Sequence, residues 1–215
     1  MKQKSRVILA LDITDHRKAL DVVAHVEQYV DAVKINYPFV LGCGMEAVRE
    51  LASNVDVICD FKVADIPNTN RLIVEQARKS GATGVICQAF PGKDSLVACI
   101  NAAEGMDVFV VTEMSHPGAD MFMSPVAEKM AQLAVDVGAT GIIAPATRPE
   151  KIKALRKTIG NLKILAPGVG TQGGSASETI KAGADYVIVG RAIYESEDPG
   201  AVARKIGAEI KGVIQ

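Results

Sequence analysis

Eight short runs of mainly apolar, often β-branched residues recur along the chain, and segments with helical periodicity separate most of them. The predicted strands are Arg6–Asp12, Ala32–Tyr37, Asp56–Lys62, Gly84–Phe90, Asp107–Glu113, Gly141–Ala146, Leu162–Gly168 and Tyr186–Ala192. The clearest predicted helices are His16–Tyr29, Met45–Ser53, Thr69–Ser80, Pro125–Val137, Pro149–Ile159 and Ala201–Ile214. Nearly continuous apolar strands alternating with helices indicate a parallel sheet that is covered on both faces.

The number of strands decides between an open and a closed sheet. Eight is the strand count of the (β/α)8 TIM barrel, whereas an open doubly wound sheet often carries a Gly-x-Gly-x-x-Gly turn after its first strand. Here Asp12 ends the first strand and no such turn follows. The sequence predicts an α/β fold in which residues 1–215 form a single TIM-barrel catalytic domain.

Charge and hydropathy exclude several classes of function. The 215 residues carry 24 Lys and Arg against 25 Asp and Glu, and no basic block gives the positive surface that nucleic acid or an anionic membrane requires. The first apolar run stops at Asp12 and no later run reaches the roughly 20 residues that span a bilayer. We therefore expect a cytoplasmic protein with neither a nucleic-acid nor a membrane partner.

The cysteines and histidines point away from a transition-metal site. Cys43, Cys59, Cys87 and Cys99 form no C-x-x-C pair, which predicts four buried thiols, and no two of the three histidines are spaced as a ligand pair. A carboxylate site for a hard cation stays open at this point.

Charged residues gather where several predicted strands end, and in a barrel those ends surround the active site. They are Asp12, Lys34, Asp60, Lys62 and Asp65, with Glu113 at the end of the fifth strand. Asp60 and Lys62 lie two residues apart, so they share one face of their strand, and Ile58 marks that face as the barrel interior. A structural ion pair would explain two such residues, but five favour an active site. A lysine held between carboxylates stays protonated and acts as an acid.

Glycines and an arginine follow the last two predicted strands. Pro167, Gly168, Val169, Gly170 and Gln172 belong to the loop Pro167–Gly174, and Gly190-Arg191 follows the eighth strand. Loops in these two places form the usual phosphate site of a TIM barrel, because glycines let backbone N–H groups approach an anion and arginine binds phosphate in bidentate fashion. We expect a phosphate-binding site here.

These motifs resemble, over essentially the whole chain, the orotidine 5′-monophosphate decarboxylase family in the compact form typical of archaea. The segments that carry the resemblance are Leu11-Asp12, Val33–Pro38, Asp60–Pro67, Thr112–Gly118, Pro167–Gly174 and Gly190–Tyr194. The resemblance implies conversion of orotidine 5′-monophosphate to uridine 5′-monophosphate, the last step of de novo pyrimidine synthesis, with no metal and no cofactor.

The resemblance also implies a role for each residue. Lys62 protonates C6 of the pyrimidine, Asp60 lies near the departing carboxylate, and Asp65 completes a Lys34–Asp60–Lys62–Asp65 array. Asp65, Ile66 and Thr69 reach into the site of the other subunit of a homodimer. The residues implied to bind the remaining parts of the substrate are Asp12 and Lys34 with Asp65 and Thr69 for the ribose, Ser115 for the base, Gln172 for base and phosphate, and Gly170, Gly190 and Arg191 for the phosphate. This chain has Gln88 at a position where some close relatives have a histidine near the dimer interface.

Three other functions share some of these features. Hexulose-phosphate synthase and ketogulonate-phosphate decarboxylase share the D-x-K-x-x-D element but bind Mg²⁺ through a glutamate where this chain has Lys34, and a lysine would repel the cation. A Schiff-base aldolase needs a neutral Lys62, which Asp60 and Asp65 disfavour. A barrel that only binds nucleotide phosphate would not need the charged array.

Overall fold

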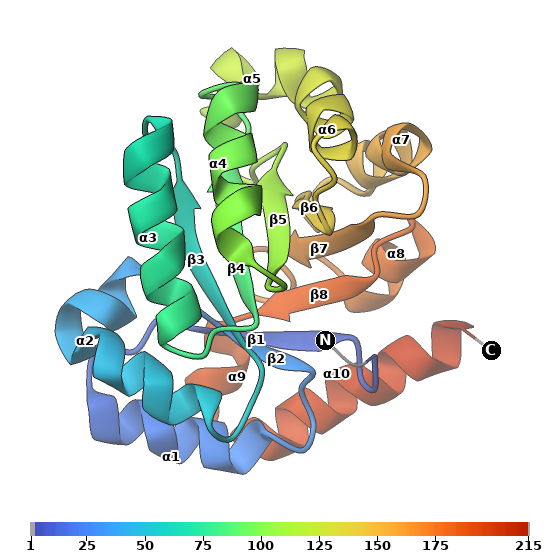
Figure 1. Cartoon of the computed structure of the whole chain (residues 1–215). Coiled ribbons are helices and arrows are strands. Elements are labelled where there is room, and N and C mark those ends of the chain that lie inside the picture. The colour runs from blue at the N-terminus through green and yellow to red at the C-terminus, as the bar shows by residue number, and fades with distance from the viewer. Residues whose placement is uncertain (1–2, 215) are drawn as a thin grey trace.

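The computed structural model describes residues 3–214 and forms a closed parallel β-barrel surrounded by helices (Figure 1). Each strand pairs with its neighbours in chain order, and the eighth pairs back with the first. The strands are β1 (Val7–Leu11), β2 (Ala32–Ile35), β3 (Val57–Val63), β4 (Gly84–Gln88), β5 (Asp107–Val111), β6 (Gly141–Ile143), β7 (Lys163–Pro167) and β8 (Tyr186–Val189). The predicted TIM barrel is confirmed.

Most of the observed strands are shorter at their carboxyl ends than the predicted ones. Asp12, Asn36 and Glu113, for example, lie just beyond the ladder of hydrogen bonds. The strand ladder stops at the rim of the barrel, whereas the predicted strands run on into the loops, where Asn36 is still half-buried and Glu113 buried but Asp12 is exposed.

The helices cover the outside of the barrel (Figure 1). They are α1 (His16–Val26), α2 (Tyr37–Ala52), α3 (Pro67–Lys79), α4 (Lys93–Ala103), α5 (Ala119–Phe122), α6 (Ala127–Asp136), α7 (Pro149–Ile159), α8 (Ala176–Lys181), α9 (Arg191–Tyr194) and α10 (Pro199–Ile214), with the 3-10 turn η1 (Ser124–Val126). All six clearest predicted helices are present. The first half of α2 was missed because Gly44, with a φ of 79°, kinks the helix and interrupts its pattern.

Side chains alternate between two apolar layers along each strand. Ile8 and Ala10 of β1 point into the barrel, whereas Val7, Leu9 and Leu11 pack against the helices. Ile58 belongs to the interior layer, which confirms the predicted orientation of β3. The interior layer fills the barrel, so space for a ligand begins only above it.

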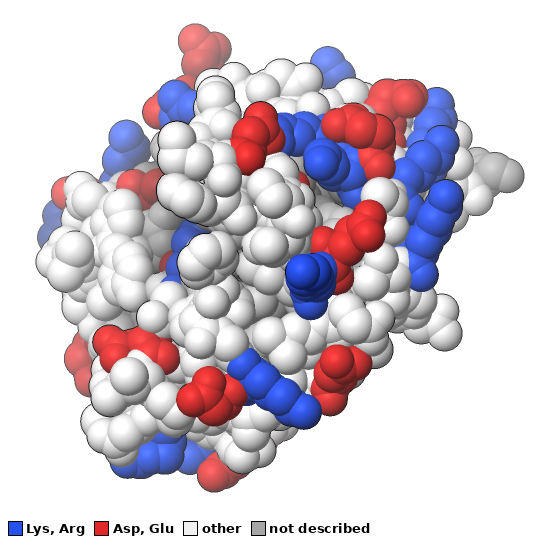
Figure 2. Space-filling model, turned by 90° about the horizontal axis from the view of Figure 1, so that it is seen from above, with Lys and Arg blue, Asp and Glu red and all other residues white. Residues whose placement is uncertain are grey.

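Cysteine burial and surface charge follow the predictions with one exception. Cys59, Cys87 and Cys99 are buried thiols, but the prediction was wrong for Cys43, which lies half-buried on α2 with its thiol donating to the carbonyl of Thr14. Acidic and basic side chains lie next to one another over the face shown in Figure 2. No helix described for residues 3–214 has both the length and the apolar character needed to cross a bilayer.

Asp31 ties the amino ends of β1 and β2 together on the face opposite the rim of loops. Its buried carboxylate accepts hydrogen bonds of 2.9–3.1 Å from the backbone N–H groups of Lys4, Ser5 and Arg6, and its own N–H donates to Val7. These N–H groups precede β1 and would otherwise have no partner in the ladder. The amino ends of barrel strands contribute to stability rather than chemistry.

We predict that Asp31→Ala lowers the free energy of unfolding by about 2–4 kcal/mol, because three backbone N–H groups in part-buried hydrogen bonds lose a charged, buried acceptor. Urea unfolding measures this loss. Asp21→Ala is the matched control, since the Asp21 side chain is 73% exposed on α1. Equal stability of the two variants would show that Asp31 does not hold the strands together.

Candidate active site

A cavity of about 240 Å³ opens where the carboxyl ends of the strands meet. Eleven of the predicted site residues line it, namely Asp12, Lys34, Asp60, Lys62, Ser115, Pro167, Gly168, Val169, Gln172, Gly190 and Arg191. Residues far apart in the sequence are thus brought together at one mouth. Asp65, Ile66, Thr69 and Gly170 do not line this cavity.

The centre of the cavity wall is a cluster of two lysines and one aspartate. Lys62 Nζ lies 2.9 Å from both carboxylate oxygens of Asp60, and Lys34 Nζ lies 3.1 Å from Asp60 Oδ2. The Lys34 and Asp60 side chains are 7% and 8% exposed, whereas that of Lys62 is 37% exposed. Lys62 is therefore the member of the cluster that a ligand in the cavity can reach.

The two lysines keep Asp60 ionised. Burial by itself would raise the pKa of Asp60, but the charges of Lys34 and Lys62 and their hydrogen bonds outweigh burial and hold this pKa below its ordinary value. The ionised Asp60 carboxylate in turn attracts both ammonium groups and holds them beside it. The neighbouring Cys59 thiol stays neutral, because burial, and secondarily the charge of Asp60, raise its pKa to about 12.

Lys62 has a backbone conformation that is rare for a residue with a side chain. Its φ is 44°, in the left-handed region, and the register between β3 and β4 is irregular between Cys59 and Val63. This conformation costs about 1–2 kcal/mol, and it persists only where the surrounding structure holds it. In this conformation the Lys62 side chain reaches both carboxylate oxygens of Asp60.

Tyr37 supports this irregular segment. Its hydroxyl donates to the carbonyl of Phe61 at 2.8 Å, and its ring stacks on the Phe61 ring with centroids 5.6 Å apart. Tyr37 and Phe61 are 24 residues apart, so neither the hydrogen bond nor the stacking has a signature in the sequence. Tyr37 therefore holds the residue that precedes Lys62.

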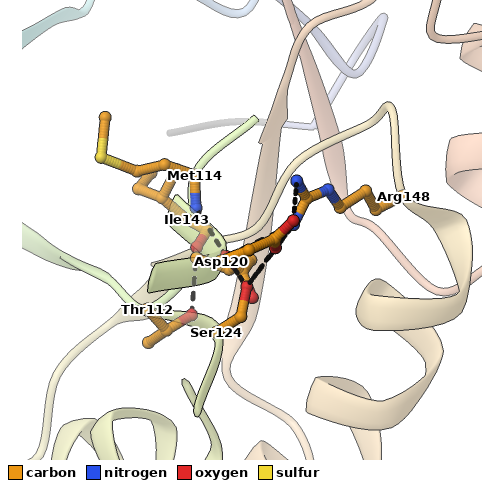
Figure 3. Close-up of polar contacts among 7 residues, drawn as sticks. Thr112, Met114, Asp120, Ser124, Ile143 and Arg148 are labelled. Atoms are coloured by element: carbon orange, nitrogen blue, oxygen red, sulfur yellow. Dashed lines mark hydrogen bonds and ion pairs between the residues drawn. The ribbon is translucent and has the colours of Figure 1, made fainter. Parts of the chain in front are cut away.

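A second polar network holds the loop that follows β5 (Figure 3). The carboxylate of Glu113 is fully buried and accepts hydrogen bonds from the N–H of Met114 and the hydroxyl of Ser124. Ser124 also lies 2.9 Å from Asp120, which pairs with Arg148 at 2.6 Å. Hydrogen bonds from Arg148 and Ser124 hold the pKa of Asp120 below its ordinary value.

The network at β5 fixes the position of Ser115, the residue that follows Met114. Ser115 Oγ donates to Gln172 Oε1 at 2.9 Å and so connects the loop after β5 to the loop after β7. This hydrogen bond joins two residues of the cavity lining that come from different loops. Glu113 stood at the end of a predicted strand, but its partners Ser124 on η1 and Arg148 before α7 emerge only in the fold.

The loop after β7 needs two of its glycines for backbone reasons. Gly168 has a φ of 107°, and a Cβ on Gly174 would lie 2.7 Å from the carbonyl oxygen of Gly168. The tight turn places Gly168, Val169 and Gln172 along the cavity. The N–H of Gly170 donates to Gly174, so in this conformation it is engaged within the loop.

Arg191 completes the same side of the cavity. It follows Gly190 at the start of α9 and is exposed, and it forms no ion pair with any residue between 3 and 214. A guanidinium beside a glycine turn can bind a phosphate group. The cavity therefore has a cationic end at β7 and β8 and a lysine–aspartate end at β2 and β3.

Asp65, Ile66 and Thr69 lie outside the cavity of their own chain. Asp65 is exposed, Ile66 is 65% exposed, and Asp65 has no salt bridge within residues 3–214. Three members of the predicted four-residue array are therefore together in one chain, and Asp65 is not with them.

The described residues offer no cluster of metal ligands. Among residues 3–214, no three His, Cys, Asp or Glu side chains converge so that they could hold a metal ion. Asp60, the carboxylate at the centre of the cavity wall, is contacted by two lysine ammonium groups instead.

Comparison with known proteins identifies the family. Residues 5–206 match the model of the orotidine 5′-phosphate decarboxylase / HUMPS family. The orotidine 5′-phosphate decarboxylase of Methanosarcina barkeri is 56% identical over 98% of this chain and 97% of its own. The crystal structure of the Methanocaldococcus jannaschii enzyme complexed with the inhibitor BMP has a TM-score of 0.91 and 42% identity over 95% of this chain and 97% of its own. The Pyrococcus horikoshii enzyme structure has a TM-score of 0.90 and 43% identity over 96% of this chain and 100% of its own. The chain belongs to the orotidine 5′-phosphate decarboxylase / HUMPS family.

Proposed function

We propose that residues 1–215 form one catalytic domain that decarboxylates orotidine 5′-monophosphate to uridine 5′-monophosphate, the last step of de novo pyrimidine synthesis, without metal or cofactor. The observation that carries this proposal is the Lys34–Asp60–Lys62 cluster, which faces a glycine turn and Arg191 across one cavity. The substrate has a matching layout, with a carboxylated pyrimidine at one end and a phosphate at the other.

Lys62 supplies the chemistry at the pyrimidine end. When the bond between C6 and the carboxylate breaks, CO₂ leaves and the electron pair stays on C6, where no conjugated system accepts it. A fixed ammonium group close to C6 stabilises this charge before the reaction begins, so no reorganisation is needed. Lys62 Nζ then gives a proton to C6, and uridine 5′-monophosphate is formed.

The surroundings of Lys62 strengthen this effect. Apolar side chains of the barrel interior line the same cavity, among them Ile86, Val111, Ile143 and Ile188. An apolar, enclosed site lowers the effective dielectric, which increases the attraction between an ammonium group and a carbanion. Asp60 fixes the position of the ammonium groups and lies near the departing carboxylate.

The remaining cavity residues bind the rest of the nucleotide. Asp12 and Lys34 hold the ribose hydroxyls, and Ser115 contacts the base. Gln172 bridges base and phosphate. Phosphate contacts come from the loop Pro167–Gly174, including Pro167, Gly168, Val169 and Gly170, and from Gly190 and Arg191. For Gly170 to contribute its N–H, the loop must release the bond to Gly174.

A homodimer completes each site in this proposal, with Asp65, Ile66 and Thr69 entering the cavity of the partner subunit. Its support is the outward position of Asp65 and the exposure of Ile66. Nearby, an apolar hollow lined by Ala64, Gln88, Phe90, Pro91, Phe122 and Met123 offers a surface for a second copy to cover. The small-molecule nucleotide is the only other partner that we propose, and the cytoplasm is the expected compartment.

Lys34 separates this function from that of the Mg²⁺-dependent sugar-phosphate enzymes. Its ammonium group lies 3.1 Å from Asp60 Oδ2, the oxygen that a cation would need, and Lys62 contacts both oxygens. Two positive charges at a carboxylate disfavour a divalent cation there. A Schiff-base lysine is disfavoured by the same contacts, because the nitrogen of Lys62 is engaged by both carboxylate oxygens of Asp60 and is not free to attack a carbonyl.

We predict that the purified protein lowers the absorbance of orotidine 5′-monophosphate at the same rate with EDTA and with Mg²⁺. The reason is that Lys62, not a metal, stabilises the charge on C6. A rate that depends on Mg²⁺, or no turnover under either condition, would contradict the proposed function and favour a sugar-phosphate substrate.

We predict that Arg191→Ala lowers kcat/KM for orotidine 5′-monophosphate by about 100-fold or more, because a charged, bidentate contact to phosphate is lost. Turnover of orotidine, which has no phosphate, should stay within about twofold of the wild-type value, since uniform loss is expected only for residues at the reacting end. Steady-state kinetics on both substrates make the comparison. An equal loss on both would assign Arg191 a role other than phosphate binding.

A further inference from the structure

One buried polar residue on α3 has no place in the cavity described above. Asn70 is 0% exposed and shares the buried stripe of α3 with Val74 and Ala77. The spacing of this stripe, at positions i, i+4 and i+7, is that of an apolar helix face. A buried amide destabilises such a face unless hydrogen bonds satisfy it, so the partners of Asn70 indicate its role.

Its partners lie on two residues, Asp65 and Ser95, and they include both backbone polar groups of Asp65. Asn70 Oδ1 accepts from the N–H of Asp65 at 2.9 Å, and Asn70 Nδ2 donates to the carbonyl of Asp65 at 2.9 Å. Ser95, in the first turn of α4 and 2% exposed, also donates to the Asp65 carbonyl at 3.1 Å and accepts from Asn70 Nδ2 at 2.7 Å. Two helices thus hold one residue of the loop after β3.

These contacts fix the direction of the Asp65 side chain. The N–H and the carbonyl belong to the peptide groups on either side of the Asp65 Cα, so holding both restricts φ and ψ together. One carboxylate oxygen, Oδ1, also accepts from the N–H of Ile66 at 2.7 Å. The loop presents the carboxylate outward at the surface, away from the cavity of its own chain.

We propose that Asn70 and Ser95 are positioning residues that hold Asp65 for the active site of the partner subunit. This inference rests on the proposed function and on the proposed sharing of sites in a homodimer. An exposed loop would move Asp65 by more than a catalytic array tolerates, because small displacements of charged groups strongly weaken their effect. The buried amide and hydroxyl make the loop rigid at the one residue that has to cross the interface.

Single variants give the first test. Asn70→Ala should lower kcat/KM for orotidine 5′-monophosphate by about 10- to 100-fold, and Ser95→Ala by about 3- to 10-fold, because Asp65 loses two side-chain hydrogen bonds in the first variant and one in the second. Ser80→Ala is the matched control, because Ser80 is a buried hydroxyl at the opposite end of α3. Its kcat/KM should stay at the wild-type value. Wild-type kinetics in Asn70→Ala and Ser95→Ala would overturn the inference.

Mixed dimers separate positioning across the interface from general destabilisation. Two differently tagged chains are co-expressed and the mixed dimer is purified on both tags. In the trans dimer, one chain carries Lys62→Ala and the other Asn70→Ala. The site that retains Lys62 then receives its Asp65 from a chain with intact Asn70, so about half of the wild-type turnover per dimer is expected for two equivalent sites.

In the cis dimer, both substitutions lie on one chain and the other chain is wild type. The only site with Lys62 then receives Asp65 from the chain without Asn70, so turnover should fall about 10- to 100-fold below that of the trans dimer. Asp65→Ala in place of Asn70→Ala should reproduce the pattern. If Asn70→Ala does not fold, Ser95→Ala takes its place in the same pair of dimers, with about a 3- to 10-fold difference expected.

Equal turnover of the cis and trans dimers would overturn the inference, because a general loss of stability does not depend on which chain carries the substitution. Wild-type protein that does not consume orotidine 5′-monophosphate would instead refute the proposed function itself. The two failures are therefore distinguishable.

Discussion

The pairing of Asp60 with two lysines is the interaction on which the functional site depends. A buried carboxylate without partners would be protonated or would destabilise the fold, and a lone buried lysine would lose its charge. Together, Lys34, Asp60 and Lys62 keep three charges at the edge of an apolar barrel, with both ammonium groups within 3.1 Å of the Asp60 carboxylate. Lys62 alone is exposed enough for its ammonium group to meet a ligand.

The barrel provides this arrangement through strand register and one local irregularity. Alternation along β2 and β3 places Lys34 and Asp60 on the interior face, directly above apolar residues such as Ala32 and Ile58. Lys62 follows with a left-handed backbone conformation, and its ammonium group contacts the same Asp60 carboxylate. The strain is tolerated because Tyr37 and the ion pairs hold the segment on both sides. The opposite side of the mouth is built on glycine turns instead, where Gly168 has a positive φ and Gly174 leaves no room for a Cβ.

Much of the fold could be predicted from the sequence, because hydrophobic periodicity and strand count are local signals. The barrel, its strand order and ten of the cavity residues follow from patterns that a parallel barrel brings to one end, whereas Ser115 was implied by the family resemblance. The parts that could not be predicted depend on contacts between distant segments. No periodic signature marks the contacts of Tyr37 with Phe61, of Glu113 with Ser124 or of Asn70 with Asp65. The kink at Gly44 interrupts the helical pattern of α2, so the sequence predicted only its second half. The hydrogen bond from the N–H of Gly170 to the carbonyl of Gly174 likewise depends on the conformation that the loop adopts.

The measurement that tests the central claim most directly is the exchange of the C6 hydrogen of uridine 5′-monophosphate in D₂O, followed by proton NMR. Exchange at C6 is the protonation step run in both directions, and it needs neither a carboxylate nor CO₂. If the Lys62 ammonium group stabilises the carbanion and delivers the proton, the wild-type protein deuterates C6 and Lys62→Ala does so at least about 1,000-fold more slowly. Exchange at the same rate in both proteins would contradict the account, because another group would then supply the proton.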